Sequence, residues 1–170
     1  MKKEGVLPVY NSVDLYFDHG DGVYLYTEDG TRYLDFTSGI GVTCLGHSHP
    51  ALVSALREQA GKLWHCSNLF KIKGQETVAK KIVDHSFASN VFFCNSGAEA
   101  VEAGIKAVRK YFYLNKKNKY KIICVNNAFH GRTLGAISAA GQDKLLEGFD
   151  PRLDGFEHVD FNNLEAIEKK

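Results

Sequence analysis

The chain has 170 residues, of which 44% are hydrophobic and 24% charged, and its formal net charge at pH 7 is +1. These values are typical of a globular domain with a real core, and the near-neutral charge argues against nucleic acid or an anionic membrane as the main partner. The cysteines are widely spaced and form no CxxC pair, which excludes a zinc site or a disulfide framework and favours reduced thiols in the cytoplasm; they are Cys44, Cys66, Cys94 and Cys124.

The first 21 residues are expected to form an arm, because their polarity is mixed and shows little periodicity. Their basic start is followed by no long apolar stretch, so we expect neither a signal peptide nor a membrane-spanning segment. A β-hairpin is predicted next. Two β-rich runs at 23–27 and 31–36 flank Asp29-Gly30, and Asp-Gly between such runs is a strong hairpin signal.

Two amphipathic helices are predicted after the hairpin. Pro50 suits the first turn of the first helix, whose apolar stripe ends at Leu63. The second helix follows a break at Gly74. His47 and His49 lie just before these helices, and no acidic or cysteine cluster accompanies them. We therefore expect no metal site in this chain.

Short apolar runs alternate with helical patterns in the second half of the chain. The runs lie at 91–94, 122–125 and 156–160, with a lysine-rich surface turn before the second. Because this alternation is typical of βαβ units, the sequence predicts an α/β fold in which the three runs form a parallel sheet. Asn162-Asn163 is expected to cap a helix that follows the last strand.

The end of the first run carries an anion-binding signal. Asn95 and Ser96 are good helix N-cap residues, and Gly97 permits close backbone approach to a ligand. A helix that starts there leaves its first amide N–H groups free, and these donors together with the helix dipole favour a phosphate. An ordinary capped turn between a strand and a helix remains the alternative interpretation.

The second run is followed by a loop that carries Phe129, His130 and Arg132. Ligands of open α/β sheets bind beyond the carboxyl ends of the strands, so this loop and the first one are expected to face one crevice. An aromatic ring, free amides and a guanidinium suit a phosphorylated aromatic cofactor that works on an acidic substrate. Taken singly, Phe129 could be a core residue and Arg132 a surface charge. No GxGxxG, GxxxxGK[ST] or GxSxG motif is present.

Motifs along the whole chain now support a resemblance. They include Gly22–Leu25, Tyr33–Phe36, Ser38–Val42, Leu45–Pro50, Leu63–Phe70, Asn95–Ala100 and Asn127–Thr133. In their order and content they resemble the N-terminal part of the class III pyridoxal-phosphate-dependent aminotransferases, and within that family most closely the members that act on N-acetylornithine.

The resemblance implies roles for individual residues. Gly97 and Ala98 match the phosphate-binding pair, where many members have threonine in place of Ala98. Phe129 matches the aromatic residue that stacks on the cofactor ring, and Arg132 matches the arginine that holds a substrate carboxylate. Ile40 falls where ornithine-specific members carry a gating tyrosine, which favours an acylated substrate.

The resemblance also implies an architecture. Residues 1–48 would form the N-terminal arm and hairpin segment of the small domain, and 49–170 the first part of the fold-type-I cofactor-binding domain, a mainly parallel sheet with helices on both faces. Tyr10 falls near a substrate-contacting tyrosine of the ornithine enzymes. The lysine that bonds the cofactor, and the aspartate that pairs with its pyridine nitrogen, would lie beyond residue 170. We therefore expect no catalytic residue in this chain, and inactivity of these 170 residues alone.

The expected whole protein is a cytoplasmic homodimer of arginine biosynthesis with pyridoxal 5'-phosphate as cofactor. It would move the terminal amino group of N-acetylornithine to 2-oxoglutarate. Succinyldiaminopimelate, succinylornithine and ornithine remain alternative amino donors, since Ile40 and Arg132 do not separate the acylated ones. A non-catalytic phosphate-binding α/β module is the rival from another class.

Overall fold

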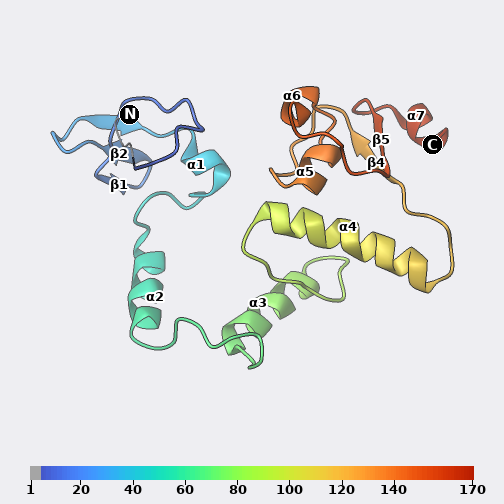
Figure 1. Ribbon diagram of the computed structural model, residues 1–170. Helices are drawn as coiled ribbons and strands as arrows, with labels where there is room; N and C mark the ends of the chain where they lie inside the picture. Colours follow the sequence, from blue (N-terminus) through green and yellow to red (C-terminus); the bar gives the residue numbers. More distant parts are fainter. Residues whose placement is uncertain (1–4) are drawn as a thin grey trace. The chain divides into compact units, whose positions relative to one another are not determined.

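The computed structural model describes residues 5–170, and the chain divides between Ile72 and Lys73 into two compact units. The family-based expectation of a domain boundary at residues 48 and 49 stays a prediction. Figure 1 shows the elements of each unit, which are described separately below. No helix within residues 5–170 is both long and apolar enough to cross a membrane.

The first unit contains a three-stranded antiparallel sheet of β1 (His19–Asp21), β2 (Tyr24–Tyr26) and β3 (Arg32–Leu34). β2 and β3 confirm the predicted hairpin. Its turn is closed by the Asp29 carboxylate, which accepts hydrogen bonds from the Thr27 hydroxyl at 2.5 Å and the Thr31 amide at 3.1 Å. Gly30 has a φ of +82°, the left-handed conformation that glycine adopts without a steric penalty.

The prediction of a simple arm over residues 1–21 is wrong at its end, because β1 lies within it; residues 1–4 of that arm lie outside the described part. β1 has only three residues, and they show no alternating apolar pattern that would have indicated a strand. A tertiary contact supplies the missing reason. A side chain at Gly20 would lie 2.6 Å from His47, so glycine lets the two segments pack closely.

Asp35 joins the sheet to the segment that follows it. One carboxylate oxygen accepts hydrogen bonds from the Thr37 hydroxyl, the Thr37 amide and the Ser38 amide at 2.7, 2.9 and 3.0 Å. The other lies 2.7 Å from Nε2 of His47. These contacts, with the Thr37 hydroxyl first and His47 next, hold the pKa of Asp35 well below its usual range. His47 thus has the Asp35 carboxylate as its partner within the first unit.

The helices that link these segments follow their local sequence signals. α1 (Ser38–Gly41) is a turn with left-handed residues rather than a regular helix, and Ile40 has a φ of +62°. α2 (Pro50–Ala60) begins with proline in its first turn, as predicted. α3 (Lys73–Asp84) begins at the break predicted near Gly74 and opens the second unit.

The second unit contains α4 (Gly97–Leu114) and a parallel pair of strands, β4 (Ile122–Val125) and β5 (Phe156–Val159). This pair confirms the predicted parallel α/β arrangement for two of the three apolar runs. The third strand, predicted at 91–94, is wrong for the described residues. A strand requires a neighbour for its ladder, yet this run forms no ladder with another strand of residues 5–170, and Phe92 is 73% exposed.

Short helices complete the second unit. They are α5 (Leu134–Ala139), α6 (Asp143–Leu146) and α7 (Leu164–Glu168). Asn163 caps α7 as predicted, with its side chain accepting a hydrogen bond from the Ala166 amide at 3.0 Å. α4 lies beside α5 in Figure 1. The buried apolar side chains gather in this unit; they are Ile105, Cys124, Ala136, Ile137, Ala139, Ala140, Leu146 and Val159.

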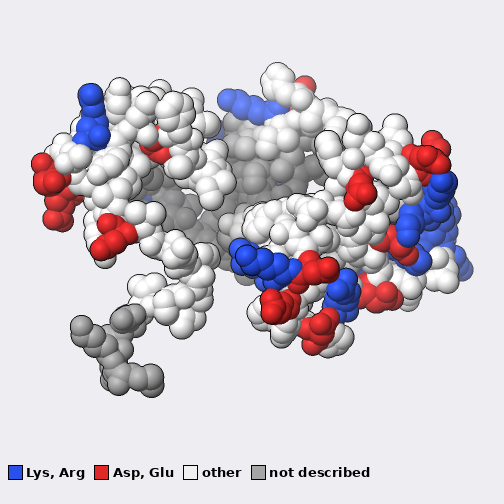
Figure 2. Space-filling view, turned by 90° about the horizontal axis from the view of Figure 1, so that it is seen from above, with Lys and Arg blue, Asp and Glu red and all other residues white. Residues whose placement is uncertain are grey.

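Charged side chains of both signs are interspersed on the face shown in Figure 2, in keeping with the net charge of +1. Elsewhere in the second unit, the Glu157 carboxylate lies 2.7 Å from the ammonium groups of both Lys121 and Lys170. These hydrogen bonds lower the pKa of Glu157 to about 2. Neighbouring opposite charges leave little net field to steer a polyanion.

Candidate functional site

The start of α4 has two hydrogen-bond donors that no acceptor of residues 5–170 uses. Ser96 adopts an extended conformation, with φ −154° and ψ 161°, and its hydroxyl accepts a hydrogen bond from the Glu99 amide at 3.2 Å. The Glu99 carboxylate reaches back to the Asn95 amide at 2.5 Å. Within residues 5–170, no acceptor is bonded to the amides of Gly97 and Ala98. These two N–H groups are therefore available to an external anion.

Space and field at this terminus both suit a phosphate. A side chain built on Gly97 would meet no atom within 4 Å, so the volume beside this residue is open. α4 has 18 residues, and the dipole of such a helix places partial positive charge at its first turn. The residues present here fit the phosphate of a cofactor.

The loop after β4 presents an aromatic ring and a guanidinium. Phe129 is 66% exposed, and the guanidinium carbon of Arg132 lies 5.8 Å from the centre of the Phe129 ring. Arg132 forms no ion pair with any carboxylate of the described chain. The arrangement leaves Phe129 accessible for stacking on a ligand ring and leaves the guanidinium free to bind a carboxylate.

A tight backbone contact brings the two loops together. A side chain built on Gly131 would lie 2.7 Å from Cβ and 3.0 Å from Cα of Ala98. Gly131 is also held at a φ of +119°. Glycine permits this approach, so the free amides of α4 and the Phe129–Arg132 pair lie on one part of the surface; the expectation that they face one crevice stays a prediction. The roles of Gly97, Ala98, Phe129 and Arg132 in binding stay predictions.

Glu102 and Gly135 are part of this arrangement, and sequence reasoning missed both. The Thr133 hydroxyl donates a hydrogen bond to the Glu102 carboxylate at 2.5 Å. The same carboxylate occupies the space beside Gly135, where a side chain would lie 2.5 Å from Oε1. A glutamate in an amphipathic helix and a glycine in a short one are common, so only the contact between them singles them out.

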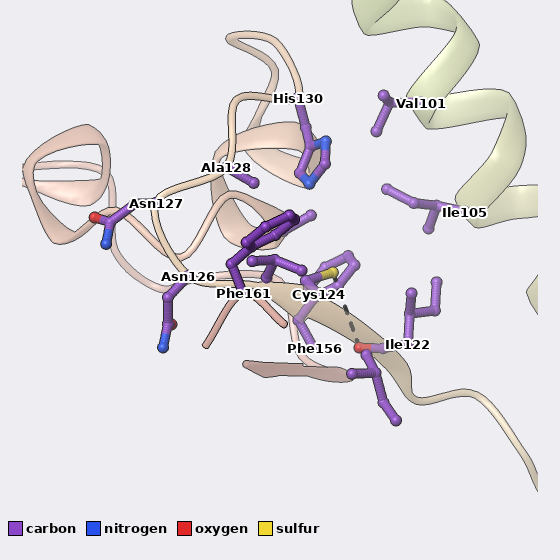
Figure 3. A pocket seen from close by; sticks show the side chains of 13 residues that line it. Val101, Ile105, Ile122, Cys124, Asn126, Asn127, Ala128, His130, Phe156 and Phe161 are labelled. Atoms are coloured by element: carbon purple, nitrogen blue, oxygen red, sulfur yellow. Dashed lines mark hydrogen bonds between the residues drawn. The ribbon is translucent and has the colours of Figure 1, made fainter. Parts of the chain in front are cut away.

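A hollow of about 690 Å³ lies next to this arrangement, between α4 and β4 (Figure 3). In Figure 3 the side chains of Val101 and Ile105, on α4, and the ring of His130 point toward it. Its walls are mainly apolar, and Gly97, Ala98, Phe129 and Arg132 do not line it. The predicted anion-binding residues thus lie outside this hollow, while His130, from the same loop as Phe129, turns into it.

The remaining candidates lie in the first unit. Ile40 is 95% exposed and Tyr10 is 78% exposed. His47 is bonded to Asp35, and His49 stands at the N-cap of α2. Within the described residues, no group of three or more His, Cys, Asp and Glu side chains is placed to hold a metal ion.

Comparisons with known proteins add to this geometry. The family model described as "Aminotransferase class-III" matches residues 8–170. Among curated proteins, the acetylornithine aminotransferase of Mesorhizobium japonicum is 49% identical in an alignment of 170 positions that covers 99% of this chain and 43% of that protein. The chain spans about two fifths of the length of the curated relatives it matches.

Comparison with solved structures shows that the fold, too, is similar to that of aminotransferases. The N-acetylornithine aminotransferase of Stenotrophomonas maltophilia is 35% identical, with a TM-score of 0.74 over 94% of this chain and 39% of that one. The ornithine aminotransferase of Toxoplasma gondii is 29% identical, with a TM-score of 0.86 over 94% of this chain and 38% of that one. That structure has pyridoxal phosphate at partial occupancy in its active site.

Proposed function

Because the chain belongs to the class III aminotransferases, which are pyridoxal-phosphate enzymes, we propose that it supplies the phosphate cradle and the substrate-carboxylate clamp of such an enzyme. The whole protein would move the terminal amino group of N-acetylornithine to 2-oxoglutarate, within arginine biosynthesis. The relatives at about half identity are named acetylornithine aminotransferases, which supports this amino donor. A homodimer in the cytoplasm is part of the same proposal.

The contact between Gly131 and Ala98 carries the proposal. Within residues 5–170, it brings together, on neighbouring backbone segments, two amides without an acceptor, an exposed aromatic ring and a guanidinium without an ion pair. A doubly charged phosphate matches the amides, a planar heteroaromatic ring matches Phe129, and a carboxylate matches Arg132. Pyridoxal phosphate with an amino-acid substrate carries all three groups.

Each residue then has a defined task. Gly97 and Ala98 donate their N–H groups to the phosphate and so fix one end of the cofactor. Phe129 covers one face of the ring and excludes water from it. Arg132 binds the carboxylate that N-acetylornithine and 2-oxoglutarate have in common, so a single guanidinium serves both half-reactions. Once bound, the cofactor supplies the electron sink for amino-group transfer.

Amino-donor preference of the full-length protein tests this function. The protein is loaded with pyridoxal phosphate and mixed with N-acetylornithine, succinylornithine, succinyldiaminopimelate or ornithine, and conversion of the cofactor is followed by absorbance. We expect kcat/KM to be highest for N-acetylornithine. A higher value for ornithine would refute the assigned donor, and absence of cofactor conversion with every amine would favour a non-catalytic phosphate-binding module.

A further inference from the structure

We propose that Glu102 has a positioning role. It holds the loop of Phe129 and Arg132 against α4 and so determines the position at which Arg132 binds a substrate carboxylate. This inference rests on the proposed function. Glu102 stands one helical turn after Ala98 on α4 and faces the N-terminus of α5. It forms no ion pair with Arg132 in the described structure, so it acts through Thr133.

The Thr133 hydroxyl connects the two helices. Its proton is donated to Glu102, while its oxygen accepts a hydrogen bond from the Ala136 amide at 3.1 Å and so caps α5. The carboxylate accepts only, so it fixes the hydroxyl in the orientation that leaves a lone pair toward Ala136. Thr133 directly follows Arg132 in the chain, so fixing Thr133 restricts the backbone that carries the guanidinium.

Gly135 also supports a positioning role for Glu102, because it has no side chain to occupy the space of the Glu102 carboxylate. It lies buried within α5, and its φ is not in the left-handed range, so its backbone does not require glycine. Glycine is also a poorer helix former than alanine. A side chain there would lie 2.5 Å from Oε1, 3.1 Å from Oε2 and 3.1 Å from Cδ of Glu102. The glycine thus makes room for the carboxylate.

Two contacts, one helical turn apart on α4, therefore hold the loop against this helix. Gly131 packs on Ala98 before Arg132, and Thr133 bonds to Glu102 after it. The same helix begins with the free amides of Gly97 and Ala98. Since α4 is a rigid element, these contacts fix the separation between the phosphate donors and the guanidinium, and small errors in that separation reduce the productive alignment of a substrate.

The test uses the full-length enzyme and measures the dissociation constants of pyridoxal phosphate and of glutarate, an unreactive dicarboxylate, together with kcat and KM. Glu102→Ala should weaken glutarate binding about tenfold or more, with a smaller change for pyridoxal phosphate. Glu102→Gln keeps an oxygen that accepts from Thr133 and should retain nearly normal binding. Thr133→Val should act like Glu102→Ala, and Thr133→Ser should restore binding. The control is Glu147→Gln, because the carboxylate of Glu147 forms no side-chain hydrogen bond in the described structure.

A double mutant makes the test independent of activity. Gly135→Ala should lower the thermal unfolding midpoint in the wild-type background, because its side chain displaces the Glu102 carboxylate. In the Glu102→Ala background, Gly135→Ala should change the unfolding midpoint little, because the carboxylate that its side chain would meet has been removed. Equal effects in both backgrounds, or unchanged glutarate affinity in Glu102→Ala while Arg132→Ala weakens it, would overturn the role of Glu102 alone. Unchanged glutarate affinity in Arg132→Ala would overturn the proposed function of Arg132, and this inference with it.

Discussion

Replacing Gly131 by alanine tests the contact on which the candidate site depends. The added methyl group would lie 2.7 Å from Cβ and 3.0 Å from Cα of Ala98, and 3.3 Å from Cβ of Ala136. Two of these atoms are close to the backbone of α4 or belong to it, so they cannot rotate away. The residue must also keep a φ of +119°, which L-residues with a side chain rarely adopt.

The expected loss of stability has two parts. Holding a non-glycine residue in a sparsely populated backbone region costs about 1–3 kcal/mol. Forcing an extra carbon into a packed contact costs about 1–3 kcal/mol more. Gly131→Ala should therefore reduce the free energy of unfolding by about 2–6 kcal/mol. It should also loosen the cofactor, because the loop that carries Phe129 must shift away from the amides of α4.

Gly148→Ala is the matched control for the backbone part. Gly148 has a φ of +80°, and a side chain there would meet no atom within 4 Å. The difference between the two variants thus reports the packing against Ala98 and Ala136, together with the greater strain of a φ of +119°. The assay is urea unfolding of the full-length protein, with retention of pyridoxal phosphate measured by absorbance after gel filtration. If Gly131→Ala unfolds at the same urea concentration as Gly148→Ala and retains the cofactor as the wild type does, the contact with Ala98 does not hold the loop on α4.

Four further outcomes are expected. Gly97→Val places a side chain in open space, so it should leave the unfolding midpoint unchanged while it raises the dissociation constant of pyridoxal phosphate; equal retention would remove Gly97 from the cradle. Phe129→Ala removes an exposed ring and should weaken cofactor binding by about 1–3 kcal/mol with little loss of stability, as measured by equilibrium titration. Arg132→Ala should leave the cofactor absorbance unchanged but weaken the binding of both substrates by about 2–5 kcal/mol, seen as raised KM values. Normal KM values would contradict the role of Arg132. Because the pKa of Asp35 is lowered in the fold, its stabilising contribution is fully present above the ordinary value of about 3.9 and is lost progressively as the pH falls from there toward the lowered pKa. Asp35→Asn should therefore flatten the acid side of the stability profile, measured by thermal unfolding from about pH 6 to about pH 2.

Local signals in the sequence determined much of the second unit and the hairpin. Ser96 and Asn163 cap the helices that they were expected to cap, because a side-chain oxygen reaches an amide only two or three residues away. Asp29-Gly30 closes its turn for the same reason. Family membership also follows from the sequence, since the matching motifs run through nearly the whole chain.

Only the tertiary structure decided which distant segments meet. The sequence placed free amides at Gly97 and a guanidinium at Arg132, but the Gly131 contact with Ala98 and the Glu102 bond to Thr133 join residues about 30 positions apart. The run at 91–94 shows the opposite case. Its apolar composition is that of a strand, yet pairing is a property of two segments, and no neighbour pairs with it in residues 5–170. Composition and local spacing specify what a segment is able to form, whereas the partner it packs against decides what it forms.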